Sequence, residues 1–232
     1  MSVLTVQLER REMGFVELSR EALAGYAEAL GLAWGALGVG PGDRVVIYDH
    51  GSSPVAYLAS QAFAPYLERG AAEHTGATAV CVDGLADNVG RLVHVLRHFK
   101  PHFLFARAEL IPLLLSGPTA VPVGQRAARL VVSADGDTPA RGERALWEGR
   151  WRGGLSLLAR CDAAAFLAAE CPRCHALRVP EDLYETQISG PEGRGLLTVR
   201  PRFVDIGPTT TELTVSPAVR GTRCAHGGFE LV

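Results

Sequence analysis

The chain has 232 residues, of which 47% are hydrophobic, and this composition is typical of a globular protein with one large domain or somewhat more. Its 23 basic and 25 acidic residues leave a formal net charge of -2, which gives no support to a nucleic-acid-binding surface. Residues 1–11 lack the apolar core of a signal peptide, and no segment reaches the roughly 18 uninterrupted apolar residues of a membrane helix. We therefore expect a cytoplasmic protein without a nucleic-acid or membrane partner.

The first 40 residues predict a hairpin followed by a long helix. Residues 3–9 place alternate side chains on opposite faces, and Gly14 separates them from a second short run at 15–18. Ser19 is placed to cap the segment that follows, in which apolar residues recur at helical spacing from 20 to 37. We expect an amphipathic helix over this range.

Strand-like and helix-like segments alternate from residue 44 onward. The predicted ranges in chain order are strand 44–48, helix 55–69, strand 77–82, helix 86–99, strand 102–105, helix 107–115, strand 128–133, helix 141–151 and strand 155–159. This alternation predicts right-handed crossover units and an α/β fold with a doubly wound, mostly parallel sheet.

The C-terminal part of the sequence contains short strand-like runs in place of helices, at 183–188, 196–199 and 212–215. We expect an α/β region over residues 1–160 and a smaller β-rich region over 161–232. We expect the second region to be either a subdomain or an extension of the sheet, with a bound metal ion that links two of its segments.

The metal prediction depends on four residues, Cys171, Cys174, Cys224 and His226, which form a C-x-x-C and a C-x-H. Three thiolates and one imidazole suit tetrahedral Zn²⁺, and a shell with no open position is structural. His175 is an alternative to His226 as the fourth ligand. The other reading is that the cysteines are free thiols in a reducing compartment, where buried cysteine behaves as a small hydrophobe.

Two further patterns carry polar residues with possible roles. His50, Ser52 and Ser53 follow the first crossover strand, where open α/β sheets bind ligands, so they are candidate groups for a carboxylate or phosphate. The alternative is a helix cap in a tight turn. His94 and His98 share one helix face, and the flanking cations favour a solvated basic face over a metal site.

Four segments of the sequence carry a family resemblance: Gly38-Val-Gly-Pro-Gly-Asp-Arg-Val-Val, Arg97-His-Phe-Lys-Pro-His-Phe-Leu-Phe, the segment from Glu170-Cys-Pro-Arg-Cys to Glu185-Thr-Gln-Ile, and Cys224-Ala-His-Gly. Together they resemble the phenylacetate-coenzyme A ligase branch of the adenylate-forming enzymes, in which a Cys-x-Cys-Gly matches the last of them. The resemblance implies a large domain with a doubly wound sheet, followed by β structure. It also implies ATP-dependent formation of an acyl adenylate from a carboxylic acid and transfer of the acyl group to coenzyme A, with a catalytic lysine on a mobile C-terminal domain. Because the sequence stops at Val232, before that domain would begin, we expect this chain to lack the catalytic lysine.

Departures from the family pattern argue against autonomous catalysis. A triphosphate needs small residues and free backbone N–H groups, whereas the corresponding segment here is Gln7-Leu-Glu-Arg-Arg-Glu-Met-Gly. The family's nucleotide-contacting Gly-Ala-Glu falls on residues 133–135 and its Tyr-Gly-x-Ser-Glu on 158–162, so that Asp135 and Asp162 are the acids retained for nucleotide and magnesium.

The sequence thus predicts an accessory or binding protein with a structural Zn²⁺ site. It argues against ATP and Mg²⁺ as cofactors. Its expected partner is another protein or a second copy, and its expected ligand is a small carboxylic acid. The alternative is an acyl- or aryl-acid ligase component that another polypeptide completes, with Asp135 and Asp162 active.

Overall fold

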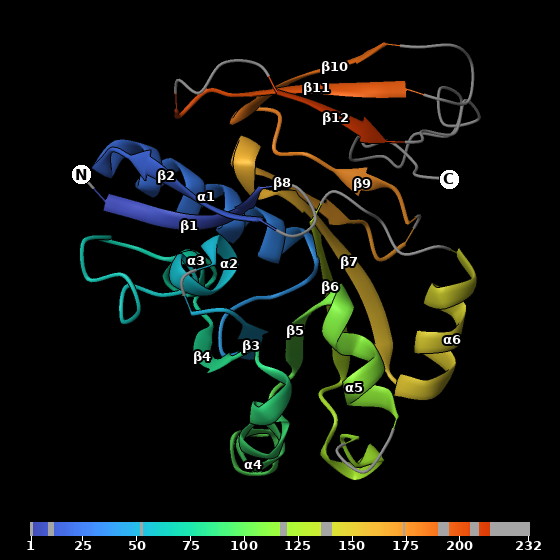
Figure 1. Ribbon diagram of the computed structural model, residues 1–232. Coiled ribbons are helices and arrows are strands. Elements are labelled where there is room, and N and C mark those ends of the chain that lie inside the picture. The colour runs from blue at the N-terminus through green and yellow to red at the C-terminus, as the bar shows by residue number, and fades with distance from the viewer. Residues whose placement is uncertain are drawn as a thin grey trace.

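The computed structural model describes residues 2–8, 12–51, 53–116, 120–135, 141–173, 175–189, 195–204 and 209–213. At its centre lies a seven-stranded sheet in the order β4-β3-β5-β6-β7-β8-β9 (Figure 1). The strands are β3 (Arg44–Asp49), β4 (Thr78–Asp83), β5 (Phe103–Arg107), β6 (Arg129–Asp135), β7 (Gly154–Cys161), β8 (Phe166–Glu170) and β9 (Leu177–Arg178). The pairs from β4 to β7 are parallel, whereas β8 and β9 are antiparallel to their neighbours. The prediction of a mostly parallel α/β sheet is confirmed.

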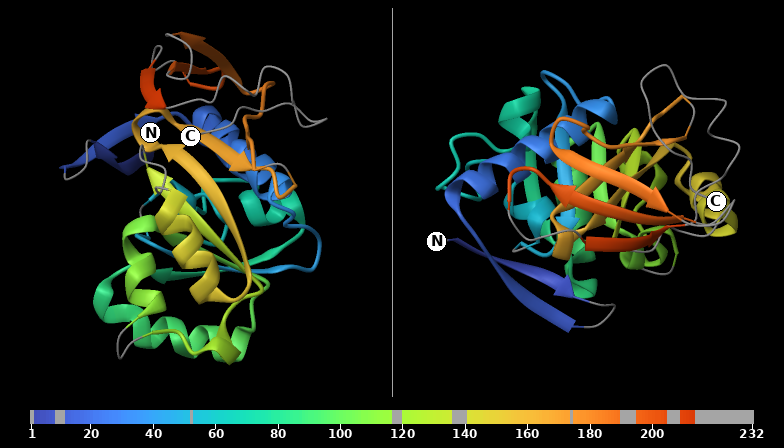
Figure 2. Two further views of the ribbon diagram at one scale, coloured as in Figure 1. Left: turned by 90° about the vertical axis from the view of Figure 1, so that its right-hand side faces the viewer. Right: turned by 90° about the horizontal axis from the view of Figure 1, so that it is seen from above.

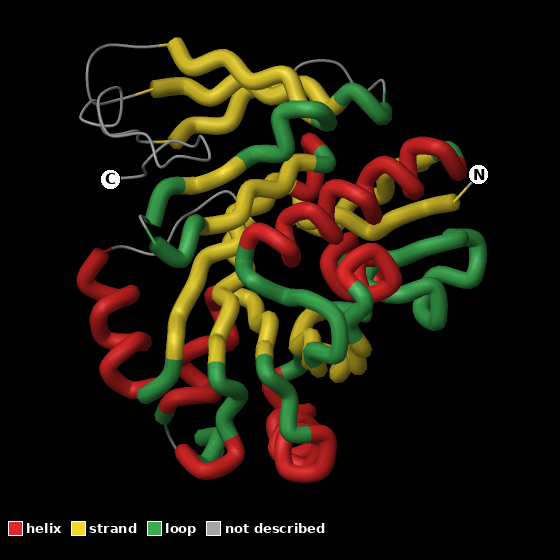
Figure 3. Tube along the Cα trace, turned by 180° about the vertical axis from the view of Figure 1, so that it is seen from behind, coloured by secondary structure: helices red, strands yellow, loops and turns green. Residues whose placement is uncertain are grey.

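Helices cover both faces of this sheet, as the view from behind shows (Figure 3). Helix α1 (Arg20–Ala36) crosses one face, where the ring of its Trp34 lies 5.0 Å from that of Phe105. Helices α4 (Val89–Phe99), α5 (Ile111–Leu115) and α6 (Arg141–Trp151) lie on the opposite face. Short helical segments complete the described part: α2 (Pro54–Tyr57), α3 (Ala71–Thr75), η2 (Ala86–Asn88), η3 (Ala108–Leu110), η4 (Val123–Gln125) and η5 (Asp162–Ala164).

The N-terminal hairpin and the Ser19 cap are both present as expected. Strand β1 (Ser2–Leu8) pairs antiparallel with β2 (Glu12–Leu18), and the Ser19 side chain accepts a hydrogen bond from the backbone N–H of Ala22. The pairing continues to Leu8 opposite Glu12, so three residues, Glu9 to Arg11, join the strands. The hairpin contacts η5, which follows the carboxyl end of β7.

The predicted helix over 55–69 was wrong, because α2 ends at Tyr57 and turns follow it. Pro65 has no backbone N–H and its ring clashes with a preceding helical carbonyl, so it does not continue a helix. The residues after Tyr57 instead form turns that lead to Gly70, the N-cap residue of α3. The predicted helix over 107–115 was also too long, since β5 extends to Arg107 and the helical part consists of η3 and α5.

Beyond residue 161 the chain extends the main sheet and then forms a second one. Strands β8 and β9 add two antiparallel members, and β10 (Tyr184–Ser189), β11 (Gly195–Pro201) and β12 (Thr209–Leu213) form a separate antiparallel sheet. Seen from above, this smaller sheet lies across the main body (Figure 2). The division at residue 160 stays a prediction. No helix in the described ranges is long and apolar enough to cross a membrane.

Candidate functional site

Charged side chains gather where the parallel strands end. The register pairs Asp49 with Asp83, Arg107 with Ser133, and residue 135 with Arg160. Because side chains two residues apart on a strand share a face, these positions lie on the same side of the sheet at its carboxyl edge. Ligands of open α/β sheets bind outside this edge. We take the carboxyl edge as the candidate site.

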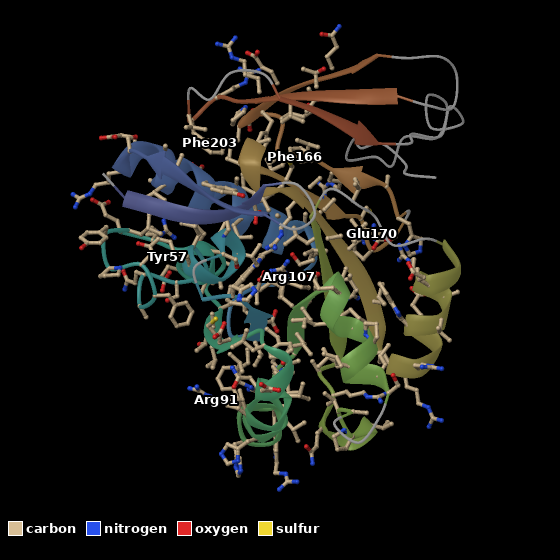
Figure 4. The ribbon with its side chains drawn as sticks, viewed as in Figure 1. Tyr57, Arg91, Arg107, Phe166, Glu170 and Phe203 are labelled. Atoms are coloured by element: carbon tan, nitrogen blue, oxygen red, sulfur yellow. The ribbon has the colours of Figure 1, made fainter. Side chains whose placement is uncertain are left out.

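Arg160 and Asp49 form a buried ion pair at this edge. The Nη1 atom of Arg160 lies 2.8 Å from Oδ2 of Asp49, and each side chain is 2% exposed. Asp49 also accepts a 2.7 Å hydrogen bond from the backbone N–H of His50, and its Oδ1 lies 3.9 Å from Nε of Arg107. Asp49 therefore holds two arginines at the end of β3, and Figure 4 labels one of them, Arg107, near the centre of the molecule.

Both arginines also contact carboxylates on neighbouring elements. Arg107 forms an ion pair with the half-exposed Glu109. The Nε atom of Arg160 lies 3.6 Å from Oδ1 of Asp162, which is 4% exposed. The hydroxyl of Ser133 is buried at the same edge and has no hydrogen-bond partner within the described ranges. Each guanidinium at the edge is thus already matched by at least one acid of the chain itself.

The predicted ligand turn at residues 49–54 is engaged in local contacts. The Oγ of Ser53 accepts a 3.3 Å hydrogen bond from Ala56 N–H as the cap of α2. Nδ1 of His50 lies 3.7 Å from the Asp83 carboxylate, and Ser52 lies outside the described residues. The capping role of Ser53 is present, and a ligand at this turn stays a prediction.

The two acids assigned from the sequence reach the same edge. Asp162 lies beside Arg160, and the backbone of Asp135 at the end of β6 is the register partner of Arg160. Sequence reasoning placed Asp49 at the start of the candidate ligand turn but missed its pairing with the arginines, and it missed Arg107 altogether. Each is a single charge that closes an apolar strand, and that signal could have identified both.

The predicted zinc site falls mostly outside the described residues. Cys171 is buried, and its carbonyl accepts a 2.9 Å hydrogen bond from His175 N–H, which closes a turn across the C-x-x-C segment. Cys174, Cys224 and His226 are not described, and the described part of the chain holds no cluster of three ligating side chains. Structural zinc stays a prediction.

Glu170 organises the neighbourhood of this cysteine segment. It is 1% exposed and accepts hydrogen bonds from Leu157 N–H at 2.7 Å and from Nη1 of Arg144 at 2.6 Å. Its Oε1 also lies 2.6 Å from Nδ1 of His175, so the opposite ring nitrogen of His175 is left for another contact. This arrangement is the one that commonly orients a metal-ligating histidine.

A separate hollow of about 570 Å³ lies on the smaller sheet. Its lining includes Arg200, Arg202 and Glu185, and Glu185 faces Arg200 across the strands and lies 3.9 Å from Arg202. Glu185 offsets one of the two arginines, and all three side chains are exposed to solvent, so the hollow is a weaker candidate than the buried carboxyl edge.

Comparison with known proteins gives a fold and no family. No family model matches the sequence, and no curated protein is detectably similar to it. The chain is similar along its whole length to the structure of 2-hydroxyisobutyryl-CoA ligase in complex with 2-HIB-AMP and CoA, with a TM-score of 0.74 and 16% identity. It is also similar over 99% of its length to the anthranilate CoA ligase AuaEII in complex with anthranoyl-AMP, with a TM-score of 0.64 and 11% identity.

A third similar structure is an isolated subdomain. The N-terminal subdomain of NpsA from Klebsiella oxytoca, in complex with 3-hydroxyanthranilyl-AMSN, matches 99% of this chain with a TM-score of 0.62 and 16% identity. The matched parts are 52%, 46% and 61% of these three proteins, so this chain spans about half the length of the structures it matches. The chain therefore shares the fold of these ligase structures, whereas membership of the adenylate-forming enzymes and of their phenylacetate-coenzyme A ligase branch stays a prediction.

Proposed function

We propose that this chain is a ligase-fold accessory or binding protein that does not form acyl adenylates by itself. The observation that carries this proposal is the buried Arg160–Asp49 ion pair at the carboxyl edge. Removing one partner of a buried ion pair leaves an uncompensated charge and costs about 3–5 kcal/mol. A ligand anion that took Arg160 from Asp49 would have to offset that cost.

The charge of the edge also disfavours a nucleotide triphosphate. Its described acidic side chains are Asp49, Asp83, Glu109 and Asp162, and its arginines are Arg107 and Arg160. The acids outnumber the arginines, and the two surplus acids, Asp83 and Glu109, are about half exposed. The phosphates of ATP would therefore meet a net repulsion that solvent and salt only partly screen. Phosphoryl and adenylyl transfer depend on clamps of the opposite sign.

The N-terminal hairpin supports the same conclusion. Its strands pair down to a connection of three residues, Glu9-Arg10-Arg11. A phosphate cradle needs glycines and small hydroxyl residues, because several backbone N–H groups must approach the same anion. None of the three connecting residues is of that type. The ligand that we propose instead is a small carboxylic acid, received without activation, because its single negative charge meets less repulsion than a triphosphate and needs no such cradle.

The test is equilibrium binding of an acyl-adenylate analogue. The NpsA N-terminal subdomain is similar in fold and its structure contains 3-hydroxyanthranilyl-AMSN, so the same compound is the probe and that subdomain is the positive control. We expect no saturable heat of binding with this chain at concentrations of about 100 µM, the middle of the usual range of enzyme-substrate affinities. Saturable binding with a 1:1 stoichiometry would overturn the proposal.

A second readout measures chemistry. Exchange of pyrophosphate into ATP is followed with a panel of acids that includes 2-hydroxyisobutyrate and anthranilate, after the acids named for the similar ligases. We expect no acid-dependent exchange. Exchange that depends on both the acid and Mg²⁺ would contradict the proposal, whatever the binding experiment gives.

A further inference from the structure

Every exposed side chain of helix α4 that carries or can gain a charge is basic. Val89, Leu92 and Leu96 are buried against the sheet, whereas the opposite side of the helix is open. The exposed members are Arg91, His94, Arg97 and His98, followed by the capping residue Lys100, and these five form the α4 basic face. Residues 88–108 contain no Asp or Glu at all. On a chain with a formal net charge of -2, this face is a local segregation of positive charge.

The α4 basic face lies at an outer end of the molecule. Helix α4 projects beyond the edge of the sheet opposite the smaller sheet, and side chains ending in nitrogen extend from it away from the body (Figure 4). The imidazole rings of His94 and His98 lie side by side with centroids 4.5 Å apart. At about 100° per residue, Arg91, His94, Arg97 and His98 fall within about one third of the circumference of the helix, on the side away from Leu92 and Leu96. The basic side chains therefore share one face about 16 Å long, the length of an 11-residue helix.

The stability of the helix accounts for only part of this charge. Cations in the last turn, such as Arg97 and His98, interact favourably with the helix dipole. Arg91 is the third residue of α4, near the positive end of that dipole, where a cation is unfavourable. Within the described ranges no ion pair involves Arg91, Arg97 or Lys100. Internal charge pairing therefore does not explain why the face is basic.

The shape of the face restricts the partner that it fits. A lipid surface would need exposed apolar side chains for insertion, but the apolar residues of α4 face the sheet. A nucleic acid would extend beyond a face of this length onto the remainder of a chain with negative net charge. The exposed rings of α4 are the two imidazoles of His94 and His98, and its phenylalanine, Phe99, is packed against the core. An acidic helix of a partner protein matches the face in length and in charge.

We propose that the α4 basic face is a docking surface for an acidic helical segment of a partner protein. Glutamates repeated on one side of that segment would meet Arg91, Arg97 and Lys100 along the face. Exposed complementary charges act mainly on the rate and specificity of association, so the contact is salt-sensitive and reversible. This inference is independent of whether the chain forms acyl adenylates.

The experiment is fluorescence anisotropy with a labelled, alanine-rich helical peptide of about 20 residues that carries glutamates along one face. The peptide control has glutamine at the same positions. The protein variants are R91E/R97E on α4 and, as a matched control, R20E/R150E, which changes the net charge equally at exposed arginines on α1 and α6. The solutions contain neither ATP nor a carboxylic acid substrate.

We expect the natural sequence to bind the glutamate peptide and not the glutamine peptide, with weaker binding as salt rises from about 50 to about 300 mM. We expect R91E/R97E to weaken binding at least about tenfold and R20E/R150E to change it less than about twofold. Absence of binding, or equal losses in the two variants, would overturn the proposal. Tighter binding to a short DNA duplex or to phosphatidylserine vesicles than to the peptide would also overturn it.

Discussion

The guanidinium of Arg160 donates a 2.8 Å hydrogen bond to the carboxylate of Asp49, from which it is separated by 111 residues of sequence. The two side chains close the carboxyl ends of β7 and β3, strands that are not neighbours in the sheet. The pair joins β3, the first strand of the main sheet in chain order, to β7, the last of its parallel strands. It also fills the place where this type of sheet receives ligands.

The Arg160–Asp49 pair is expected to behave as a buried, coupled unit. R160M or D49L alone should each destabilise the fold by about 3–5 kcal/mol, because the remaining buried charge loses its closest partner and keeps a longer contact, with Arg107 or Asp162. The double variant should recover part of that loss, with a coupling energy of about 2 kcal/mol. Urea unfolding of the four proteins measures the coupling. Strict additivity would show that the two side chains do not depend on each other.

A contact between α1 and Phe203 predicts opposite effects of two glycine substitutions in one helix. A Cβ at Gly25 would lie 2.3 Å from Cβ of Phe203, whereas a Cβ at Gly35 meets nothing within 4 Å. Phe203 also stacks with Tyr26 and meets Tyr184 edge-on, and so joins α1 to the smaller sheet (Figure 4).

G25A should therefore destabilise the protein by about 1–3 kcal/mol through overpacking. G35A should stabilise it by about 0.5–1 kcal/mol, since alanine restricts the unfolded chain and suits a helix. Thermal unfolding of both variants tests the contact. If the two substitutions gave the same sign, α1 and Phe203 would not be in close contact.

Glu73 is expected to give the turn region between α2 and α3 a pH-dependent stability. Its carboxylate accepts hydrogen bonds from Ser60 Oγ at 2.7 Å and from the backbone N–H groups of Gln61 at 3.1 Å and Gly70 at 2.8 Å. Burial raises the pKa of Glu73, but these hydrogen bonds outweigh it and hold the pKa below its usual 4.5. The ionised form is therefore the one that stabilises the fold.

It follows that the stability from Glu73 is complete above pH 4.5 and is lost as the pH falls through the lowered pKa of the folded state. E73Q should cost about 1–2 kcal/mol near neutral pH, and its difference from the natural sequence should shrink below pH 4.5. Unfolding curves at several pH values provide the measurement. A difference that stayed constant down to acid pH would exclude the charged hydrogen bonds as its cause.

The cysteine segment predicts structural zinc. Elemental analysis of the purified protein should find about one equivalent, and C171S should lose it together with much of its stability, because a structural zinc site is coupled to folding. H175A and H226A distinguish the two histidines as fourth ligand, since only the true ligand lowers the metal content. Less than about half an equivalent in the natural sequence would favour free thiols.

The sequence predicted elements with strong local signals. The hairpin of β1 and β2, the Ser19 cap and α1 depend on alternation, a capping side chain and helical spacing, all of which act between near neighbours. The parallel arrangement of the central strands could also be predicted from the sequence, because alternating strands and helices permit few other arrangements.

Two local interpretations failed because tertiary contacts or single residues outweighed propensity. The apolar run of 55–69 suggested a helix, but Pro65 and the hydrogen bonds of Ser60 and Glu73 hold it as turns. Strand β8 was not predicted, because its alanine-rich sequence has no strand signature and becomes extended by pairing with β7.

The sequence by itself determined most of the central strands and helices and which of their faces are buried, since those properties repeat with the local period of the backbone; the turns after α2 and strand β8 are the exceptions. Only the tertiary structure decided that Asp49 meets Arg160 and that Asp162 joins them. Such pairings depend on strand order and register, which bring together residues far apart in the chain. Local periodicity contains no information about those distances.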